Sequence, residues 1–526
     1  ALSLNKNTTG DFNVAVGFCS LRCNATTDNN TAVGAFALNK NTANSNTAVG
    51  KSTLACNTSG ANNTALGNSM ETNTTGSNNT AAGNGALQAN TTASGNTAFG
   101  RITLSANTTG ANNVAVGLCA LRANTTGAIN TSVGACSLCH NTTGTRNTAV
   151  GFCALHENTN NDNTAFGSSS LRDNTSGTRN VAIGPNAMRN ATTADCNTAI
   201  GVSAMQNSST GNDNVGIGNG ALQSNGTGCR NTAVGSLAGD AITTGHENTA
   251  VGHKALTSAT TSCGNVAVGM CSLHNHTTGG DNNAIGMCSQ FTTSTGAANN
   301  SMGHKSMELN TTGDSNVAIG EQSLRRNTTA NNNTAVGKEA LCANTTGADN
   351  SAVGYRALKA NTTATGNNSF GYESLSANTT GCQNTAMGFQ AGTSNITGDG
   401  NVALGYKALF KNNGSTPDFN VAIGRQALYS TTTAVRNSAL GLNAMYSTTT
   451  GGCNVGIGGN ALYTNTTGQY NTAVGYNALC TNGTAISNTA VGYFSLAANT
   501  TGACNVAMGV QAGDNTTTGI NNTFIG

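Results

Sequence analysis

Apolar and polar positions recur with a period of 17 residues along the chain. The motif first appears at Asn13, and its last copy is Asn522-Thr523-Phe524-Ile525-Gly526. There are 31 copies; of the 30 intervals between their first asparagines, 26 are 17 residues long, three are 16 and one is 19. Numbered from that asparagine, the consensus is N-T-A-V-G-x-x-A-L-x-x-N-T-T-G-x-x, and a residue's place in it is called its repeat position. A fixed period predicts a repeat architecture.

The repeat unit favours strand over helix. Helical hairpin repeats need more than about 30 residues, and asparagine, threonine and glycine are weak helix formers. Seventeen residues with glycine-marked corners predict one coil of a parallel β-solenoid (a β-roll or β-helix), with one strand at repeat positions 2–4 and a second around positions 8 and 9. Coils stacked at about 4.8 Å predict a single all-β domain over residues 1–526, an elongated rod on the order of 145 Å long.

Side chains alternate across a strand, so positions 2 and 4 face one way and position 3 the other. We assign the aliphatic residue at position 4 and the leucine or methionine at position 9 to the core. The alanine at position 3 then suggests a tight contact on the other face, through which chains associate. Glycine fills position 5 in all 31 copies, which predicts a positive φ or a close backbone approach. The 19-residue unit predicts a small corner insertion, a surface loop, near residues 412–418.

Composition excludes several classes of protein. The chain has 68 glycines, 2 prolines, 8% charged residues and a net charge of +2, which is too dilute and too balanced for binding nucleic acid or an anionic membrane. The 37% of hydrophobic residues argue against disorder, and no apolar run of about 20 residues could span a bilayer. Because the chain begins at Ala1 inside a repeat and ends on one, we expect a fragment of a longer fibre.

Units such as Asn471-Thr472-Ala473-Val474-Gly475-Tyr476-Asn477-Ala478-Leu479 carry a family resemblance. They resemble the repeats of bacterial and phage tail-fibre-domain proteins and, more distantly, the head repeats of YadA-like trimeric autotransporter adhesins. The resemblance covers the whole chain and implies a parallel β-roll, often trimeric, that is exposed on a cell or virion and used for attachment. The unit is longer than the adhesin repeat, and its Asn-Thr-Thr-Gly corner departs from that pattern.

Most repeats contain an Asn-x-Ser/Thr sequence at the second corner, which begins at repeat position 12. Asparagine and threonine suit turns and can form hydrogen-bonded ladders between stacked coils. The same sequence is the acceptor for N-glycosylation, and glycans would help a rod of low charge to stay soluble. Both interpretations stay open for the candidate acceptors Asn73, Asn107, Asn124, Asn141, Asn174, Asn310, Asn344, Asn361, Asn378, Asn465 and Asn499.

Seventeen cysteines occur, several at position 7 of adjacent coils. A Cα separation of about 4.8 Å would allow disulfides between neighbouring coils; alternatively, these are small side chains tolerated at a variable position. The candidate ladder cysteines are Cys119, Cys136, Cys153, Cys271 and Cys288. The Cys136-x-x-Cys139 pair is isolated, without the second pair of ligands that a structural zinc site requires. The seven histidines are spread over several repeat positions. We therefore expect no metal site and no cofactor.

Aromatic residues form two rows in the second half of the chain. The rows predict either mutual stacking that stabilises the sheet or an exposed aromatic strip that docks glycans or a partner fibre. The residues are Tyr355, Tyr372, Phe389 and Tyr406 at position 6, and Tyr429, Tyr446 and Tyr463 at position 10.

No constellation of titratable residues suggests catalysis, so we do not expect an enzyme. The main hypothesis is a non-enzymatic structural subunit of an extracellular fibre, filament or stalk, glycosylated at some of its acceptors, at the cell or virion surface. The alternative is an adhesin or phage tail fibre that binds a receptor or glycan. An ice-binding solenoid is a third hypothesis, weakened because adjacent threonines at positions 13 and 14 should point to opposite faces. The expected partners are further copies of the chain, as a trimer or filament, and glycans.

Overall fold

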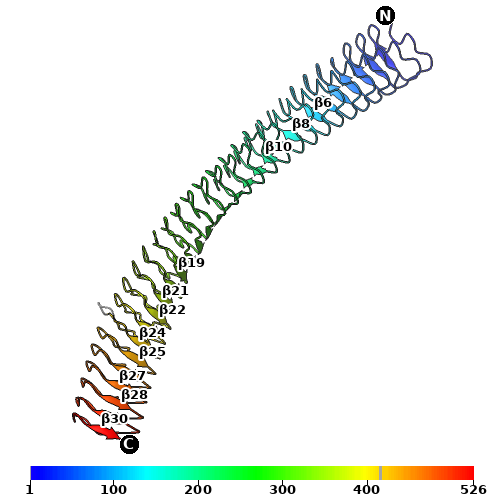
Figure 1. Cartoon of the computed structure of the whole chain (residues 1–526). Coiled ribbons are helices and arrows are strands. Elements are labelled where there is room, and N and C mark those ends of the chain that lie inside the picture. Colours follow the sequence, from blue (N-terminus) through cyan, green and yellow to red (C-terminus); the bar gives the residue numbers. More distant parts are fainter. Residues whose placement is uncertain (1, 414–417) are drawn as a thin grey trace. The chain divides into compact units, whose positions relative to one another are not determined.

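The computed structural model describes residues 2–413 and 418–526. In this part of the chain the secondary structure consists of short parallel strands, one per coil, with turns between them and no helix. The predicted parallel β-solenoid of 17-residue coils is thus confirmed. The coils group into two compact units, Ala1–Gly264 and Asn265–Gly526, and Figure 1 shows one strand arrow per coil in each.

The first unit contains strands that are each three residues long. They are β1 (Val14–Val16), β2 (Thr31–Val33), β3 (Thr47–Val49), β4 (Thr64–Leu66), β5 (Thr80–Ala82), β6 (Thr97–Phe99), β7 (Val114–Val116), β8 (Thr131–Val133), β9 (Thr148–Val150), β10 (Thr164–Phe166), β11 (Val181–Ile183), β12 (Thr198–Ile200), β13 (Val215–Ile217), β14 (Thr232–Val234) and β15 (Thr249–Val251).

The second unit repeats the same element. Its strands are β16 (Val266–Val268), β17 (Asn283–Ile285), β18 (Asn300–Met302), β19 (Val317–Ile319), β20 (Thr334–Val336), β21 (Ser351–Val353), β22 (Asn368–Phe370), β23 (Thr385–Met387), β24 (Val402–Leu404), β25 (Val421–Ile423), β26 (Ser438–Leu440), β27 (Val455–Ile457), β28 (Thr472–Val474), β29 (Thr489–Val491), β30 (Val506–Met508) and β31 (Thr523–Ile525).

Within each unit, every strand pairs in parallel with the next strand at the same repeat position. Val33 of β2 lies opposite Val49 of β3, although the interval there is 16 residues. Leu404 of β24 lies opposite Ile423 of β25 across the 19-residue unit. Extra or missing residues are therefore absorbed in the turns, and each repeat position becomes a column of stacked side chains. Residues 414–417, in the predicted corner insertion, lie outside the described residues.

The predicted second strand around positions 8 and 9 is wrong. That segment forms turns, in which the residues at positions 7 and 9 have positive φ, as at Ile102 (φ 57°) and Leu104 (φ 51°). A left-handed conformation costs about 1–2 kcal/mol for a residue other than glycine. The cost is offset because both residues still donate their N–H groups to adjacent coils, to the carbonyl oxygens of Asn84 (2.9 Å) and Ala120 (3.0 Å).

The assignment of the strand faces is inverted relative to the prediction. Ala115 at position 3 is fully buried, whereas Val116 at position 4 is 37% exposed. The core consists of the alanines at positions 3 and 8 and the leucine or methionine at position 9, such as Leu121. The alanine face is therefore the interior of the coil and cannot join chains.

The width of the coil explains this inversion. The side chain at position 9 fills the interior and leaves room opposite for alanine or something smaller. At Gly216, which occupies position 3, a Cβ atom would lie 2.7 Å from Cγ of Met205 at position 9. A branched side chain at position 3 would overfill the interior, so position 4 must face outward.

The glycine at position 5 meets both of its predicted requirements. Gly117 has a φ of +131°, and a Cβ atom there would lie 2.7 Å from the carbonyl group of Gly134 in the next coil. Both the left-handed backbone and the close stacking exclude a side chain at this corner.

Candidate functional site

Two columns of buried asparagine cross-link the coils. At position 1, the main-chain N–H of Asn113 donates to Oδ1 of Asn96 (2.9 Å), and its Nδ2 donates to the carbonyl oxygen of Gly127 (2.9 Å). At position 12, Nδ2 of Asn107 donates to Oδ1 of Asn90 (3.0 Å) and to the carbonyl oxygen of Gly110 (2.9 Å). These bonds satisfy polar groups that would otherwise be costly to bury.

The eleven candidate glycosylation acceptors all belong to the position-12 column. Each is fully buried, and each donates from Nδ2 to the carbonyl oxygen three residues further along the chain: Asn73, Asn107, Asn124, Asn141, Asn174, Asn310, Asn344, Asn361, Asn378, Asn465 and Asn499. The structure thus has the ladder that was one of the two interpretations. A glycan needs the same nitrogen in solvent, so the folded chain presents no accessible acceptor at these positions.

Of the threonines that motivated the ice-binding hypothesis, those at position 13 are part of the stack, whereas those at position 14, such as Thr109, are exposed. Oγ1 of Thr108, at position 13, donates to the main-chain carbonyl of Thr125 in the next coil at 3.0 Å. The same contact joins Thr125 to Thr142 at 3.1 Å. These hydroxyl hydrogens bond to protein rather than to solvent.

The predicted cysteine columns are present without disulfides. No disulfide links any two cysteines within the described residues. The pKa of Cys153 is raised mainly by burial and to a smaller extent by the neighbouring Cys136. The pKa of Cys288 is raised in the same way by burial and by Cys271. The residues of both columns, Cys119, Cys136, Cys153, Cys271 and Cys288, have φ between 53° and 57°. They serve as small side chains at a left-handed turn position.

The outer strand face is formed by the side chains at positions 2 and 4 of the strands. Position 4 is Val, Ile, Leu, Met, Phe or Ala in every strand, and no strand carries a charged residue. Phe166 and Met387, one from each unit, are 54% and 52% exposed. The face is uncharged in both units and combines an apolar column at position 4 with a column of mainly threonine and valine at position 2. It replaces the alanine face as the candidate contact surface.

The aromatic row at position 6 stacks as one of the two interpretations predicted. Ring centroids lie 5.1 Å apart for Tyr355 and Tyr372, 5.0 Å for Tyr372 and Phe389, and 5.5 Å for Phe389 and Tyr406. The Arg356 guanidinium lies 4.8 Å from the centroid of the Tyr355 ring. Mutual stacking is confirmed for this row; three of its rings are also exposed.

The row at position 10 also stacks, and Phe410 extends it. Centroid distances are 5.1 Å for Phe410 and Tyr429, 4.9 Å for Tyr429 and Tyr446, and 5.2 Å for Tyr446 and Tyr463. Sequence analysis missed Phe410, although its repeat position already placed it in this row.

A hollow of 410 Å³ adjoins the end of this row. Its lining consists of Asn443, Asn460 and Asn477 at position 7, with Tyr463 and Cys480 at position 10. Nδ2 of Asn443 donates to Oδ1 of Asn460 at 3.3 Å. The Oδ1 atoms of Asn443 and Asn477 are buried without a hydrogen-bond partner. The hollow thus combines an aromatic ring with three amide side chains, two of which have an oxygen without a hydrogen-bond partner.

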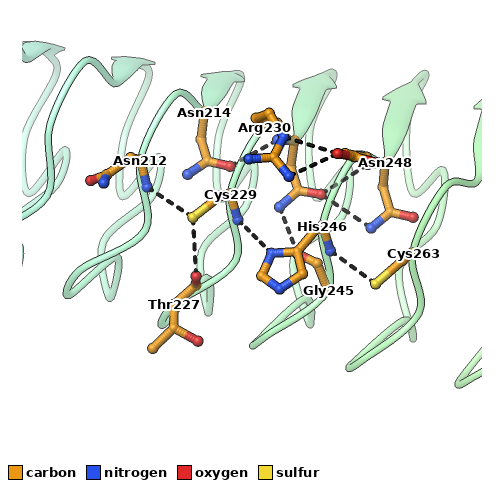
Figure 2. Close-up of polar contacts among 11 residues, drawn as sticks. Asn212, Asn214, Thr227, Cys229, Arg230, Gly245, His246, Asn248 and Cys263 are labelled. Carbon is orange, nitrogen blue, oxygen red and sulfur yellow. Dashed lines mark hydrogen bonds and ion pairs between the residues drawn. The ribbon is translucent and has the colours of Figure 1, made fainter.

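A row at position 16 holds histidine and cysteine in a structural role (Figure 2). The main-chain N–H of Asn212 donates to Sγ of Cys229 at 3.4 Å, and that of Cys229 donates to Nδ1 of His246 at 3.1 Å. The N–H of His246 in turn donates to Sγ of Cys263 at 3.4 Å. Each side chain therefore caps the turn of the preceding coil.

A second group of cysteine and histidine was missed by sequence analysis. Cys139 and His156 share the column at position 10, and His140 and Glu157 share the column at position 11 of the same two coils. One ligand atom from each of Cys139, His140 and His156 lies within 4.8 Å of the others. Two of the histidines, which are spread over several repeat positions along the chain, are thus brought together here. The signal was present as Cys-His and His-Glu pairs 17 residues apart.

Glu157 contacts both histidines of this group. Its Oε1 is hydrogen-bonded to Nδ1 of His156 at 2.8 Å, and its Oε2 lies 3.0 Å from Nδ1 of His140. The imidazole rings meet edge to face with centroids 4.6 Å apart. Burial raises the pKa of the Cys139 thiol to about 11, although the nearby Arg122 acts in the opposite direction.

The fold defines the chain as a parallel β-solenoid repeat protein. Comparison with protein-family models and with curated proteins gave no match. The resemblance to tail-fibre and adhesin-head repeats therefore remains an expectation. Within the described residues, the chain forms no helix with the length and hydrophobicity of a membrane span.

Proposed function

We propose that the chain is a non-enzymatic structural subunit of an extracellular fibre or stalk, whose copies pack against one another through the outer strand face. The observation that carries this proposal is the apolar column at position 4, which is uninterrupted in both units. Soluble monomers rarely leave contiguous apolar patches larger than a few hundred Å² in contact with water. Covering such a surface contributes about 25 cal/mol per Å² of apolar area.

A second copy of this chain is the occupant that suits this face. The strand side chains repeat once per coil, and only a surface with the same spacing matches them along its length. Since positions 2 and 4 carry no charge, two identical faces meet without like-charge repulsion, as a symmetric contact requires. The fifteen strands of the first unit offer 15 × 2 = 30 outward residues, and a stable interface uses about 20–30 residues a side.

The mass of the assembly in solution tests this proposal. Val116→Lys with Val133→Lys places two charges on the outer strand face, and we expect association at least about tenfold weaker than for the natural chain. Thr126→Lys with Thr143→Lys is the matched control, because these exposed threonines belong to the same two coils but lie outside the strands. Light scattering that finds the mass of a single chain for the natural protein at all concentrations, or equal weakening by both variants, would contradict the proposal.

Glycan binding is a second candidate function, favoured by the hollow beside Tyr463. Sugar rings pack an apolar face on aromatic side chains and hydrogen-bond to amides, and the hollow offers both. We expect Tyr463→Ala to abolish binding on an array of immobilised glycans, while Tyr355→Ala, in the other row, leaves it unchanged. Absence of glycan binding by the natural chain would remove this candidate.

A further inference from the structure

The group around Cys139 is formed by two neighbouring coils, each of which contributes the residues at repeat positions 10 and 11. Positions 10 and 11 supply Cys139 and His140 from one coil, and His156 and Glu157 from the next. Within residues 2–413 and 418–526, no other three side chains of the cysteine, histidine or acidic type gather so closely. Cys139 is buried, whereas both histidine rings reach solvent.

We propose that Cys139, His140 and His156 form a binding site for a divalent transition-metal ion of the zinc type. A thiolate sulfur and two imidazole nitrogens are ligands that zinc prefers, and such a set disfavours calcium and magnesium, which take oxygen ligands. Tetrahedral zinc holds nitrogen and sulfur at 2.0–2.3 Å, so bound ligand atoms lie about 3.5 Å apart. The ligand atoms now lie within 4.8 Å of one another, so binding requires side-chain rotations that shorten these separations by about 1 Å.

The main chain holds the two contributing coils in register before any ion binds. The N–H of His140 donates to the carbonyl oxygen of His156 at 3.0 Å. Two residues earlier in each of these coils, the N–H of Leu138 donates to the carbonyl oxygen of Ala154, also at 3.0 Å. The ion therefore has to order only side chains, which lowers the entropic cost of binding.

Glu157 positions the histidines. Its hydrogen bond to Nδ1 of His156 leaves the Nε2 atom of that ring for the ion, in the carboxylate–histidine–metal arrangement of many zinc sites. Nδ1 of His140 lies 3.0 Å from Oε2 of the same carboxylate, so Glu157 contacts both rings of the proposed site.

Three protein ligands leave the fourth tetrahedral position to solvent. Two arginines neighbour the group. Arg172 is neutralised by its ion pair with Asp173 at 2.7 Å, and Arg122 is exposed, so that water screens its charge. The site is independent of the outer strand face, because it lies in the turn at positions 10 and 11. Its failure would therefore leave the proposed fibre function untouched.

Cobalt(II) is the probe for this proposal, since it occupies zinc sites and its absorption reports a bound thiolate. The full chain is reduced, freed of metal with a chelator and titrated with cobalt(II) alone, and zinc(II) is then added in competition. We expect one cobalt ion per chain with a sulfur-to-cobalt charge-transfer band that zinc removes. Cys139→Ser should abolish the band, and His140→Ala and His156→Ala should each weaken binding at least about tenfold.

Matched variants separate this site from the other thiols and imidazoles of the chain. Cys480 and His274 occupy the same repeat position as Cys139 and His156 without the other ligands. Cys480→Ser and His274→Ala should leave the affinity and the band unchanged. Glu157→Gln should retain the band and weaken binding about 10- to 100-fold, the effect of a positioning residue.

The proposal is overturned by either of two results. One is a natural chain that binds no cobalt. The other is a band of equal intensity and affinity in the Cys139→Ser and His156→Ala variants. Circular dichroism of each variant verifies that the solenoid remains folded, and because His140 lies at the surface, His140→Ala keeps the test decisive should Cys139→Ser unfold.

Discussion

The side-chain amide of Asn107 donates to the side-chain carbonyl of Asn90, one coil earlier, at 3.0 Å. Similar bonds join Asn124 to Asn107 at 2.7 Å and Asn344 to Asn327 at 3.0 Å. The position-12 column thus carries polar cross-links through the interior of each unit, beside the apolar core of alanine and leucine.

Removing one link of this column should destabilise the coil that contains it. Asn107→Ala leaves Oδ1 of Asn90 without its donor and removes the Oδ1 acceptor of Asn124, and we expect a loss of about 1–3 kcal/mol. Because a long repeat array opens locally, hydrogen exchange of the neighbouring amides is the appropriate measurement. Thr109→Ala, at an exposed position of the same coil, should change exchange little; equal effects from both variants would speak against the ladder's energetic role.

The inverted strand faces predict unequal costs for two truncations in one coil. Leu121→Ala opens a cavity in the filled interior, and we expect a loss of about 2–5 kcal/mol. Val116→Ala removes an outward side chain, and we expect less than about 1 kcal/mol in the dissociated chain. Urea denaturation at low protein concentration compares the two. A larger loss for Val116→Ala would place position 4 in the core after all.

His276 stands in the asparagine column and should make stability depend on pH. Its ring is buried with Nε2 2.5 Å from the carbonyl oxygen of Gly279, and burial lowers the pKa of His276 below its ordinary value of 6.5. At His276 the unfolded chain therefore binds a proton more readily than the folded chain does. The contribution of the neutral imidazole to folding stability is fully present above about pH 6.5 and is lost as the pH falls below that value.

His276→Asn should remove that part of the acid sensitivity. The urea midpoint of the variant should exceed that of the natural chain at about pH 5 and approach it at about pH 8. His274→Asn, two residues away at a partly exposed position, is the control. A difference between His276→Asn and the natural chain that is the same at both pH values would show that the imidazole charge has no part in it.

Asp418 predicts a pH dependence of opposite sign. In the 19-residue unit its Oδ2 accepts hydrogen bonds from Asn412 (2.8 Å) and Asn401 (3.3 Å), where other coils use the carbonyl oxygen of position 15. Burial raises the pKa of Asp418. A raised folded pKa means that stability is present below the unfolded value of about 3.9 and is lost as the pH rises through the folded value.

Asp418→Asn should consequently raise the melting temperature at neutral pH and leave it nearly unchanged in acid. The asparagine oxygen still accepts both hydrogen bonds, and the buried charge is gone. Asp399→Asn is the control, because Asp399 is a partly exposed carboxylate in the preceding coil. A melting temperature that falls at neutral pH would indicate that the charge itself stabilises this corner.

Features that depend on a single repeat position could be predicted from the sequence. In-register stacking makes residues one period apart into neighbours, which is why the rows through Tyr372 and Tyr446 follow from the sequence alone. The Cys139 group was missed because it needs two columns to be considered together. It also needs turns at positions 10 and 11 that bring side chains of both columns to one place.

By itself, the sequence determined the period, the all-β solenoid class and the need for glycine at a corner such as Gly117, because these follow from spacing and from the absence of a side chain. Only the tertiary structure decided which strand face is inside. Alternation along a strand separates Ala115 from Val116 but is symmetric under exchange of the two faces. The width of the coil breaks that symmetry, because Leu121 fills the interior and leaves space opposite for only a small side chain such as that of Ala115.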